Sequence, residues 1–366
     1  MQKTQRVIPL VIVAVYSGIV LALCRPGIAV FDKVLLAYAQ CMVWIWVVVA
    51  LCALALSVAE QYRMRTPGSG VTIMRNTVVH FVDSRWRHDR FAGLVLPFVC
   101  YVPLIASYNI FKALYLPSAG FWAGRYIARS ERALLGGHDA WQVTHWLVSS
   151  PWASQVIDLF YHAGFFPMVF GIAACSFAKP GSQLAWRYLT SYLLVWSVQG
   201  NLIAYLLPAA GPAIRGIMHP GASSFTALNA ILQSQSHYLH AHGAIGLSSV
   251  AIQHGLVAVF GHSDAALGGG ISAMPSLHNG MAVLLACAAW SIGRRTGIAA
   301  TLYALLIWFG SVHLGWHYAL DGIVACILTV LAWQGVGRIS VAFERRDAVA
   351  PPTVEEDCEA PLALAA

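Results

Sequence analysis

Charged side chains are scarce in this sequence of 366 residues. Asp, Glu, Lys and Arg together make up 10% of the chain, whereas hydrophobic residues make up 58%. Soluble globular domains carry roughly 25% charged residues. A soluble protein of this length is therefore excluded, because so much apolar surface needs a lipid solvent. The composition predicts a polytopic integral membrane protein.

Paired cysteine motifs are also missing. The eight cysteines include no Cys-x-x-Cys pair, and seven of them lie in or beside apolar stretches. They are expected to be small core residues rather than a disulfide or zinc framework. Acidic residues number 15 against 22 basic ones, which gives a net charge of +7. This excess implies no nucleic-acid partner, because basic cytoplasmic loops that face an anionic lipid leaflet account for it.

Eight stretches of the sequence are poor in charge and long enough, or nearly so, to cross the roughly 30 Å hydrocarbon core of a bilayer. Unpaired backbone groups are costly in lipid, so we expect these stretches to be helices. The predicted fold class is an all-α integral membrane protein with about eight transmembrane helices. The stretches comprise residues 7–24, 36–58, 92–114, 153–176, 188–207, 274–292, 298–315 and 318–337.

The distribution of Lys and Arg predicts the orientation of these helices. With the N-terminus in the cytoplasm, 15 of the 22 basic residues fall on the cytoplasmic side and 7 on the opposite side. Cytoplasmic loops typically carry such an excess. Both termini are therefore expected in the cytoplasm. The membrane would be the plasma membrane, or the inner membrane if the protein is bacterial.

Two histidine motifs lie about 40 residues apart, Ser272-Ala-Met-Pro-Ser-Leu-His278 and His313-Leu-Gly-Trp-His317-Tyr-Ala-Leu-Asp321. Residues four apart on a helix share one face. Asp321 can therefore accept a hydrogen bond from one imidazole nitrogen of His317 and leave the other free to attack phosphorus. The alternative is a structural polar pair at the helix end.

His278 strengthens the interpretation of a site. It stands at the start of the sixth apolar stretch, where Pro275 suits a first helical turn and Ser272 or Ser276 suits the N-cap. The N–H groups of such a helix end attract a phosphate oxygen, and His278 could protonate a leaving oxygen. Counting spans places both motifs at the same extracytoplasmic face. They predict phosphoryl transfer that needs no metal ion or other cofactor.

Pro275-Ser-Leu-His278 and His317-Tyr-Ala-Leu-Asp321 resemble the second and third signature blocks of the type 2 phosphatidic acid phosphatase superfamily, which includes lipid phosphatases. Leu277 and the His-Tyr pair resemble the inositol phosphorylceramide synthase branch, as do Leu134–Gly137 and Pro208–Pro212 more loosely. The resemblance implies His317 as nucleophile, Asp321 as its orienting carboxylate, His278 as general acid and Ser276 near the phosphate.

The sequence departs from that family at its phosphate-binding positions. The first block, a Lys followed at a distance by Arg-Pro, is not recognisable, and Ser311 stands where an Arg is usual. The phosphate-binding cation is therefore expected elsewhere. Arg215 is the first candidate, and the second candidates are Arg125, Arg129 and Arg132, which recur at helical spacing.

Three further residues are candidates for a headgroup pocket: His313, Asp158 and His162. Asp158 and His162 are equally well explained as a buried hydrogen-bonded pair. The spacing of His237, His240 and His242 fits no standard zinc pattern, so we expect ordinary surface or lid histidines and no metal site.

We expect four divisions of the chain: an accessory transmembrane hairpin (1–60), a basic cytoplasmic loop (61–90), a catalytic bundle (91–340) and a disordered cytoplasmic tail (341–366). Within the bundle, outer loops cover 115–152 and 208–273, and a loop as long as the second should be partly helical and folded over the site. The oligomeric state is left open.

The predicted function is phosphoryl transfer from a lipid phosphate at the extracytoplasmic face through a phosphohistidine, most simply hydrolysis. A phospholipid headgroup transferase similar to inositol phosphorylceramide synthase is the alternative. Two other classes are weaker. A transporter would need ionisable groups near the bilayer midplane, and a lipid-binding protein without turnover would not need both histidines and the carboxylate.

Overall fold

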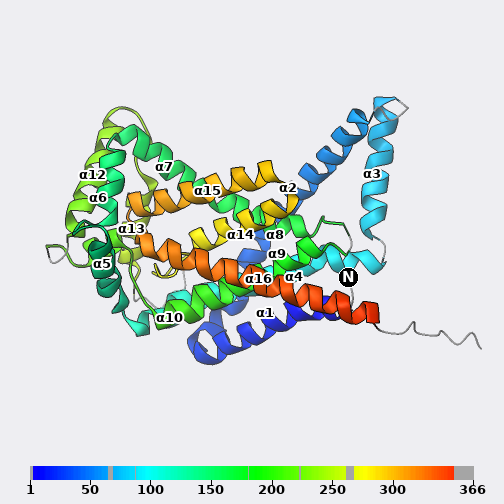
Figure 1. Cartoon of the computed structure of the whole chain (residues 1–366), viewed down its shortest axis with the longest axis horizontal. Helices are drawn as coiled ribbons and strands as arrows, with labels where there is room; N and C mark the ends of the chain where they lie inside the picture. Colours follow the sequence, from blue (N-terminus) through cyan, green and yellow to red (C-terminus); the bar gives the residue numbers. More distant parts are fainter. Residues whose placement is uncertain are drawn as a thin grey trace, which may run out of the picture.

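The computed structural model describes residues 3–64, 69–86, 88–179, 181–221, 224–260 and 268–349. These residues form helices joined by turns, and no β-strand occurs among them. The predicted all-α class is confirmed. Long helices lie side by side along the molecule, and a group of shorter helices closes one end (Figure 1).

Each of the eight predicted apolar stretches is helical. The helices are α1 (Lys3–Leu23), α2 (Ile28–Arg63), α4 (His88–Ile110) with a π-helical turn η2 (Phe111–Tyr115), α7 (Pro151–Ala163) followed by α8 (Phe165–Cys175), α9 (Gln183–Leu194) with a π-helical stretch η4 (Val195–Ile203) and α10 (Ala204–Leu206), α14 (Leu277–Ile292), α15 (Arg294–His313) and α16 (Ala319–Val349). Within the described residues, five helical segments are long and apolar enough to span a membrane, and α1 and α14 are shorter apolar helices. Eight crossings therefore remain a prediction.

The centre of the bundle is α14, which packs against α9, α15 and α16. Its sequence supplies small side chains, among them Gly280, Ala282 and Ala286, that are buried. Small residues let neighbouring helix backbones approach closely in a membrane protein. A Cβ on Gly280 would lie only 3.0 Å from Gln199 Oε1 and 3.2 Å from Thr329 Oγ1. The position of α14 fixes that of His278, in its first turn.

The helices that close one end of the bundle are called the cap helices: α5 (Ala123–Leu134), α6 (Ala140–Leu147), α11 (Pro212–Met218), α12 (Phe225–Ala241) and α13 (Ser248–Ala258). They share a hydrophobic cluster that includes Trp141, Phe225 and Leu228, and Tyr318 of the second histidine motif belongs to it. The expectation that the segment 208–273 is partly helical is confirmed for its described residues.

Two predicted segments differ from expectation. The predicted basic loop 61–90 contains a helix, α3 (Gly70–Trp86), which forms a hairpin with α2 that projects from the bundle (Figure 1). The predicted tail begins inside α16, which continues to Val349, and residues 350–366 lie outside the described part of the chain. Two short 3₁₀ turns complete the structure, η1 (Arg25–Gly27) and η3 (Leu116–Ala119).

Candidate functional site

The two histidine motifs meet at the end of the bundle that the cap helices cover. The backbone N–H of Ser276 donates to the carbonyl of Asp321 at 3.3 Å. The imidazole of His317 bonds to the carbonyl of Ala273 at 2.8 Å. The ring centroids of His278 and His317 lie 6.5 Å apart. The structure thus brings together His278, His317 and Asp321, which the span count placed at one face.

The segment Pro208–Pro212 and its flank run between the two motifs and join them through backbone contacts. Ala209 accepts a hydrogen bond from the N–H of Ala273 at 2.8 Å, and Ala213 donates to the carbonyl of Gly315 at 2.9 Å. Between them, a Cβ on Gly211 would lie 2.0 Å from the carbonyl oxygen of Trp316. Only a glycine permits this approach, so the Ala-Ala-Gly-Pro sequence has a structural reason at the site.

The tautomer of His317 follows from its partner. A backbone carbonyl only accepts hydrogen bonds, so Nδ1 of His317 carries the proton that it donates to Ala273. Nε2 therefore has the free lone pair. The carboxylate of Asp321 is fully buried, lies 3.5 Å from Nδ1 and accepts the N–H of Tyr318 at 2.9 Å. The direct hydrogen bond expected from Asp321 is thus made by Ala273, and Asp321 supplies negative charge close behind it.

The first turn of α14 is held by buried polar contacts. Ser276 accepts the N–H of Asn279 at 3.4 Å and is fully buried, while Pro275 precedes this N-cap instead of occupying the first turn. Asn279 donates to the hydroxyl of Ser311 at 3.3 Å. The carbonyl of Ser311 accepts the N–H of His317 at 3.1 Å. Ser311, which stands where the family usually has Arg, therefore connects the turns that carry both histidines.

His278 lies among aromatic rings. Its imidazole stacks on Tyr161 with centroids 4.9 Å apart, and Phe165 lies 6.2 Å away. Two neighbouring imidazoles, one of them backed by a carboxylate, have the parts for nucleophilic and acid–base chemistry on one substrate.

A model of the PAP2 superfamily matches residues 125–334, which include the site and most of the bundle. The chain belongs to the PAP2 superfamily. Searches of curated proteins and of solved structures give no match. Membership supports a phosphatase or phosphotransferase type of function.

The first candidate for the missing PAP2 cation, Arg215, is half-buried beside the second histidine motif. Gly124 brings it close to Tyr318 of that motif. A Cβ on Gly124 would lie 3.6 Å from Nη1 of Arg215 and 3.5 Å from the hydroxyl of Tyr318. Arg215 lines a small pocket of about 110 Å³ with Phe121 and His219, among others. Among the described residues, no carboxylate lies within ion-pair distance of its guanidinium, so its charge is available to an anion.

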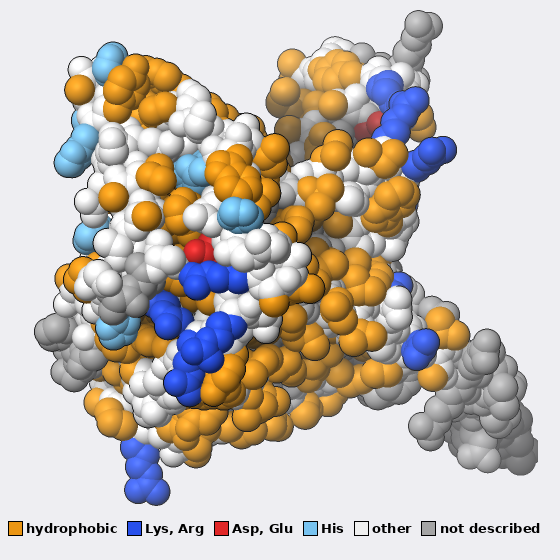
Figure 2. Space-filling view, turned by 60° about the vertical axis from the view of Figure 1, so that its left-hand side comes forward, with side chains coloured by type: hydrophobic (Ala, Val, Ile, Leu, Met, Phe, Trp, Pro, Cys, Tyr) orange, Lys and Arg blue, Asp and Glu red, His pale blue; other side chains and the backbone are white. Residues whose placement is uncertain are grey.

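The arginines of α5 are less suitable. Lys and Arg side chains gather on the end of the molecule that carries the cap helices (Figure 2), where Arg125 and Arg129 are exposed. Arg132 instead bonds to the buried carboxylate of Asp139 at 2.6 Å and to Ser224. The pKa of Arg132 is raised, chiefly by its bond to Asp139. The carboxylate of Asp139 therefore already neutralises the charge of Arg132.

Lys112 is a cation that sequence reasoning counted only for topology. It lies in η2, half-buried, with its ammonium 5.9 Å from the ring centroid of Tyr108. Its backbone touches Gly270, where a Cβ would lie 2.5 Å from the Lys112 carbonyl. No carboxylate within the described ranges pairs with its ammonium. A lysine near the end of an apolar span was the signal that could have found it.

The three predicted headgroup-pocket residues have different surroundings. His313 is fully enclosed, stacked on His145 with centroids 4.0 Å apart and bonded to Ser154 at 2.9 Å. Asp158 is also fully buried, and only His162 of that pair is partly exposed, at 31% of its side chain. His162 is therefore the one of the three that can meet a ligand as the side chains stand.

Glu131 of α5 is a buried carboxylate that the sequence did not single out. It accepts the N–H groups of Ala319 and Leu320 at the start of α16, and of Ala140 at the start of α6. Burial raises the pKa of Glu131 to about 7 in spite of these bonds. It joins two cap helices to the helix that carries Asp321. Across the described residues, no three His, Cys, Asp or Glu side chains gather as a metal site would require.

Proposed function

We propose that this protein transfers a phosphoryl or phosphate-ester group from a membrane lipid through a covalent phosphohistidine on His317. The observation that carries the proposal is the hydrogen bond from Nδ1 of His317 to the carbonyl of Ala273, because it leaves Nε2 free as a nucleophile. The site would lie at the extracytoplasmic face of the plasma membrane, or of the inner membrane in a bacterium, with both termini in the cytoplasm.

In the first step, Nε2 of His317 attacks phosphorus, an N–P bond forms and the P–O bond to the lipid breaks. The departing oxygen takes its proton from His278, which must begin this step protonated. The new positive charge on His317 is stabilised by Asp321 and by the carbonyl of Ala273.

The phosphate oxygens need positive charge around them. Arg215 and Lys112 are the proposed sources, because both are half-buried and neither has a carboxylate partner among the described residues. The N-terminal end of α14, closed by Ser276, adds backbone N–H dipoles. The arrangement requires no metal ion to balance the phosphate charge.

In the second step, an acceptor oxygen attacks phosphorus and releases His317. Water as acceptor gives a lipid phosphate phosphatase, which is the simplest form of the proposal. An alcohol acceptor gives a headgroup transferase similar to inositol phosphorylceramide synthase. The observation that favours this alternative is the contact of Pro208–Pro212 with both histidine motifs, because that segment carries part of the resemblance to the synthase branch.

The test is release of inorganic phosphate by the purified protein in EDTA, from phosphatidate, a polyprenyl pyrophosphate and sphingoid phosphates in mixed micelles. Release is expected to survive EDTA and to fall by more than about 1000-fold in His317→Ala, because the nucleophile is lost. His242→Ala is the matched control, since His242 is an exposed histidine directly after α12.

Release that EDTA abolishes, or that persists in His317→Ala, would contradict the proposal. If no phosphate is released from any of these lipids, phosphatidylinositol with an alcohol acceptor is the next substrate pair. The headgroup transferase predicts formation of the inositol phosphodiester of the alcohol with equimolar diacylglycerol, and loss of both in His317→Ala.

A further inference from the structure

A second histidine is held in the same way as His317. Nδ1 of His162 lies 2.8 Å from the carbonyl of Asp158, and 3.4 Å from Oδ1 of the same residue. His317 has its own Nδ1 2.8 Å from a carbonyl and 3.5 Å from the carboxylate of Asp321. In both cases a carbonyl fixes the proton on Nδ1, and an aspartate four residues away supplies negative charge.

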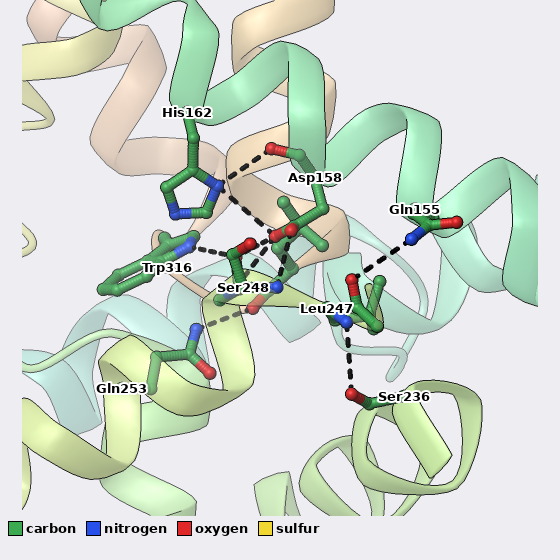
Figure 3. Close-up of polar contacts among 11 residues, drawn as sticks. Gln155, Asp158, His162, Ser236, Leu247, Ser248, Gln253 and Trp316 are labelled. Carbon is green, nitrogen blue, oxygen red and sulfur yellow. Dashed lines mark hydrogen bonds and ion pairs between the residues drawn. The ribbon is translucent and has the colours of Figure 1, made fainter. Parts of the chain in front are cut away.

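In the neutral imidazole, this bond places the lone pair of His162 on Nε2. Figure 3 shows it turned away from Asp158 and lying beside the indole ring of Trp316. The His162 side chain is 31% exposed, whereas Asp158 behind it is fully buried. The pair has the arrangement of a general base, with a partly exposed imidazole and a buried carboxylate that would stabilise the imidazolium after proton uptake.

His162 faces the candidate site. Its ring centroid is 6.3 Å from that of Trp316, the residue before His317. Tyr161 next to it stacks on His278 at 4.9 Å and on Trp316 at 6.3 Å. The aromatic rings of Tyr161 and Trp316 thus connect His162 to both predicted catalytic histidines.

Asp158 is fixed in place by three hydrogen bonds from the start of α13. It accepts the N–H of Ser248 at 2.7 Å, and both the N–H and the hydroxyl of Ser249, at 3.1 and 2.5 Å. The hydroxyl of Ser249 in turn accepts the indole N–H of Trp316 at 2.8 Å. This network ties Asp158 to the loop that carries His317 (Figure 3).

The surroundings of His278 and His162 differ. Phe165 and Tyr161 flank His278, which suits the apolar end of a lipid leaving group. His162 instead lies beside Trp316. The indole N–H of Trp316 donates to the hydroxyl of Ser249, at the polar start of α13. A small polar acceptor arriving from the side of the cap helices would meet His162 first.

We propose that His162 is the general base of the second half-reaction, an inference that rests on the function proposed above. The acceptor, water or an alcohol, gives its O–H proton to Nε2 of His162 while its oxygen forms a bond to phosphorus. The N–P bond of the phosphohistidine breaks, and its electron pair returns to Nε2 of His317. His162 later passes the proton to solvent. His278 then serves the leaving lipid and His162 serves the acceptor.

The experiment separates the two half-reactions by rapid quenching with ³²P-labelled phosphatidate, or with phosphatidylinositol labelled at its phosphate if phosphatidate is not cleaved. His162→Ala and His162→Asn are compared with the full-length wild-type chain in the same micelles. Asn retains an N–H donor close to the position of Nδ1, so it keeps the bond to the Asp158 carbonyl and removes only the base. His242→Ala is the control, because Nδ1 of His242 also lies 2.8 Å from the carbonyl four residues earlier.

Both His162 variants are expected to form the phosphoenzyme at the wild-type rate and to break it down 10²- to 10⁴-fold more slowly, so that label accumulates on the protein. Added imidazole should restore breakdown, and the loss of rate at acidic pH that marks a required base should disappear from this step. His242→Ala should behave as wild type.

Two results would overturn the role of His162 while leaving the phosphohistidine intact: breakdown at the wild-type rate in both variants, or an equal loss in formation and breakdown. Failure of the proposed function looks different. In that case the wild-type protein itself forms no acid-labile phosphoenzyme, or His317→Ala is labelled as well.

Discussion

At the scale of single residues, pairs close in sequence were predictable and partners far away were not. The spacing of His317 and Asp321 predicted a close pair on one helix face, and Nδ1 lies 3.5 Å from Oδ2, although His317 is in the turn before α16 and not on the helix. The carbonyl of Ala273, which accepts the hydrogen bond from Nδ1 of His317, lies 44 residues away, and no local pattern points to it. The helical spacing of Arg125, Arg129 and Arg132 likewise gave no sign that Asp139 would neutralise Arg132. Spacing in the sequence predicts which residues of one local segment lie close together. The contacts with Ala273 and Asp139 depend instead on how several helices pack.

One missing methyl group supports the geometry of His317. Gly211 has an ordinary backbone conformation, with φ −62°, so Gly211→Ala adds no backbone strain. Its Cβ would lie 2.0 Å from the carbonyl oxygen of Trp316, and a backbone atom cannot swing aside. We expect turnover to fall about 100-fold, because small displacements of a catalytic group have effects of that order. The measurement is the rate on the best lipid substrate.

Gly335→Ala is the control for that substitution. Gly335 lies within α16 and has nothing within 4 Å of its Cβ position, so activity should be unchanged. Wild-type turnover in Gly211→Ala would mean that the contact with Trp316 does not position His317.

At the scale of elements, hydropathy predicted the long helices and charge spacing predicted α5. Arg125 and Arg129 are exposed on α5, and Ala128 and Glu131 are buried, as an amphipathic helix requires. The pattern could not show what the buried face contacts. Glu131 binds the start of α16, whose N–H groups come from residues far along the chain. Helix α3 was missed because its sequence has little apolar character, so hydropathy could not distinguish it from a loop.

Glu131 predicts how the attachment of α5 to α16 depends on pH. Burial raises its pKa from an ordinary value of 4.5 to about 7, so the folded protein binds this proton more tightly than the unfolded chain. Its contribution is complete below about pH 4.5 and is lost as the pH rises through 7. The loss is at most on the order of 3 kcal/mol, because a tenfold change in proton affinity corresponds to about 1.4 kcal/mol.

The measurement is thermal unfolding in detergent between pH 4.5 and 7.5, followed by tryptophan fluorescence. Glu131→Gln should flatten the decline in melting temperature that the wild-type protein shows in this range. Glu60→Gln, at an exposed position on α2, is the control and should keep the decline. Parallel curves for wild type and Glu131→Gln would show that Glu131 does not titrate there.

At the scale of the whole molecule, the site and the N-terminus lie at opposite ends (Figure 1). The two histidine motifs and the cap helices occupy one end, and the turn between α14 and α15, with Arg294 and Arg295, lies at the other. The count of basic residues predicts that the end with the N-terminus faces the cytoplasm. The number of crossings was harder to predict, because α9 continues through η4 and α10 into the cap without a helix of clear spanning character.

The orientation is testable by labelling in intact cells with a membrane-impermeant maleimide, with the unmodified chain as background. His242→Cys, at an exposed position directly after α12, should react in intact cells. Thr296→Cys, exposed at the opposite end, should react only after the membrane is permeabilised. The reverse pattern would place the histidine motifs in the cytoplasm.

The bond between His317 and Ala273 also has a chemical consequence. Because Nδ1 is occupied by the carbonyl, phosphorus can reach only Nε2, so the adduct must be the tele isomer of phosphohistidine and not the pros isomer. The two isomers differ in ³¹P chemical shift and in their resistance to hydrolysis. The ³¹P chemical shift of a trapped intermediate therefore reports which nitrogen of His317 faces the substrate.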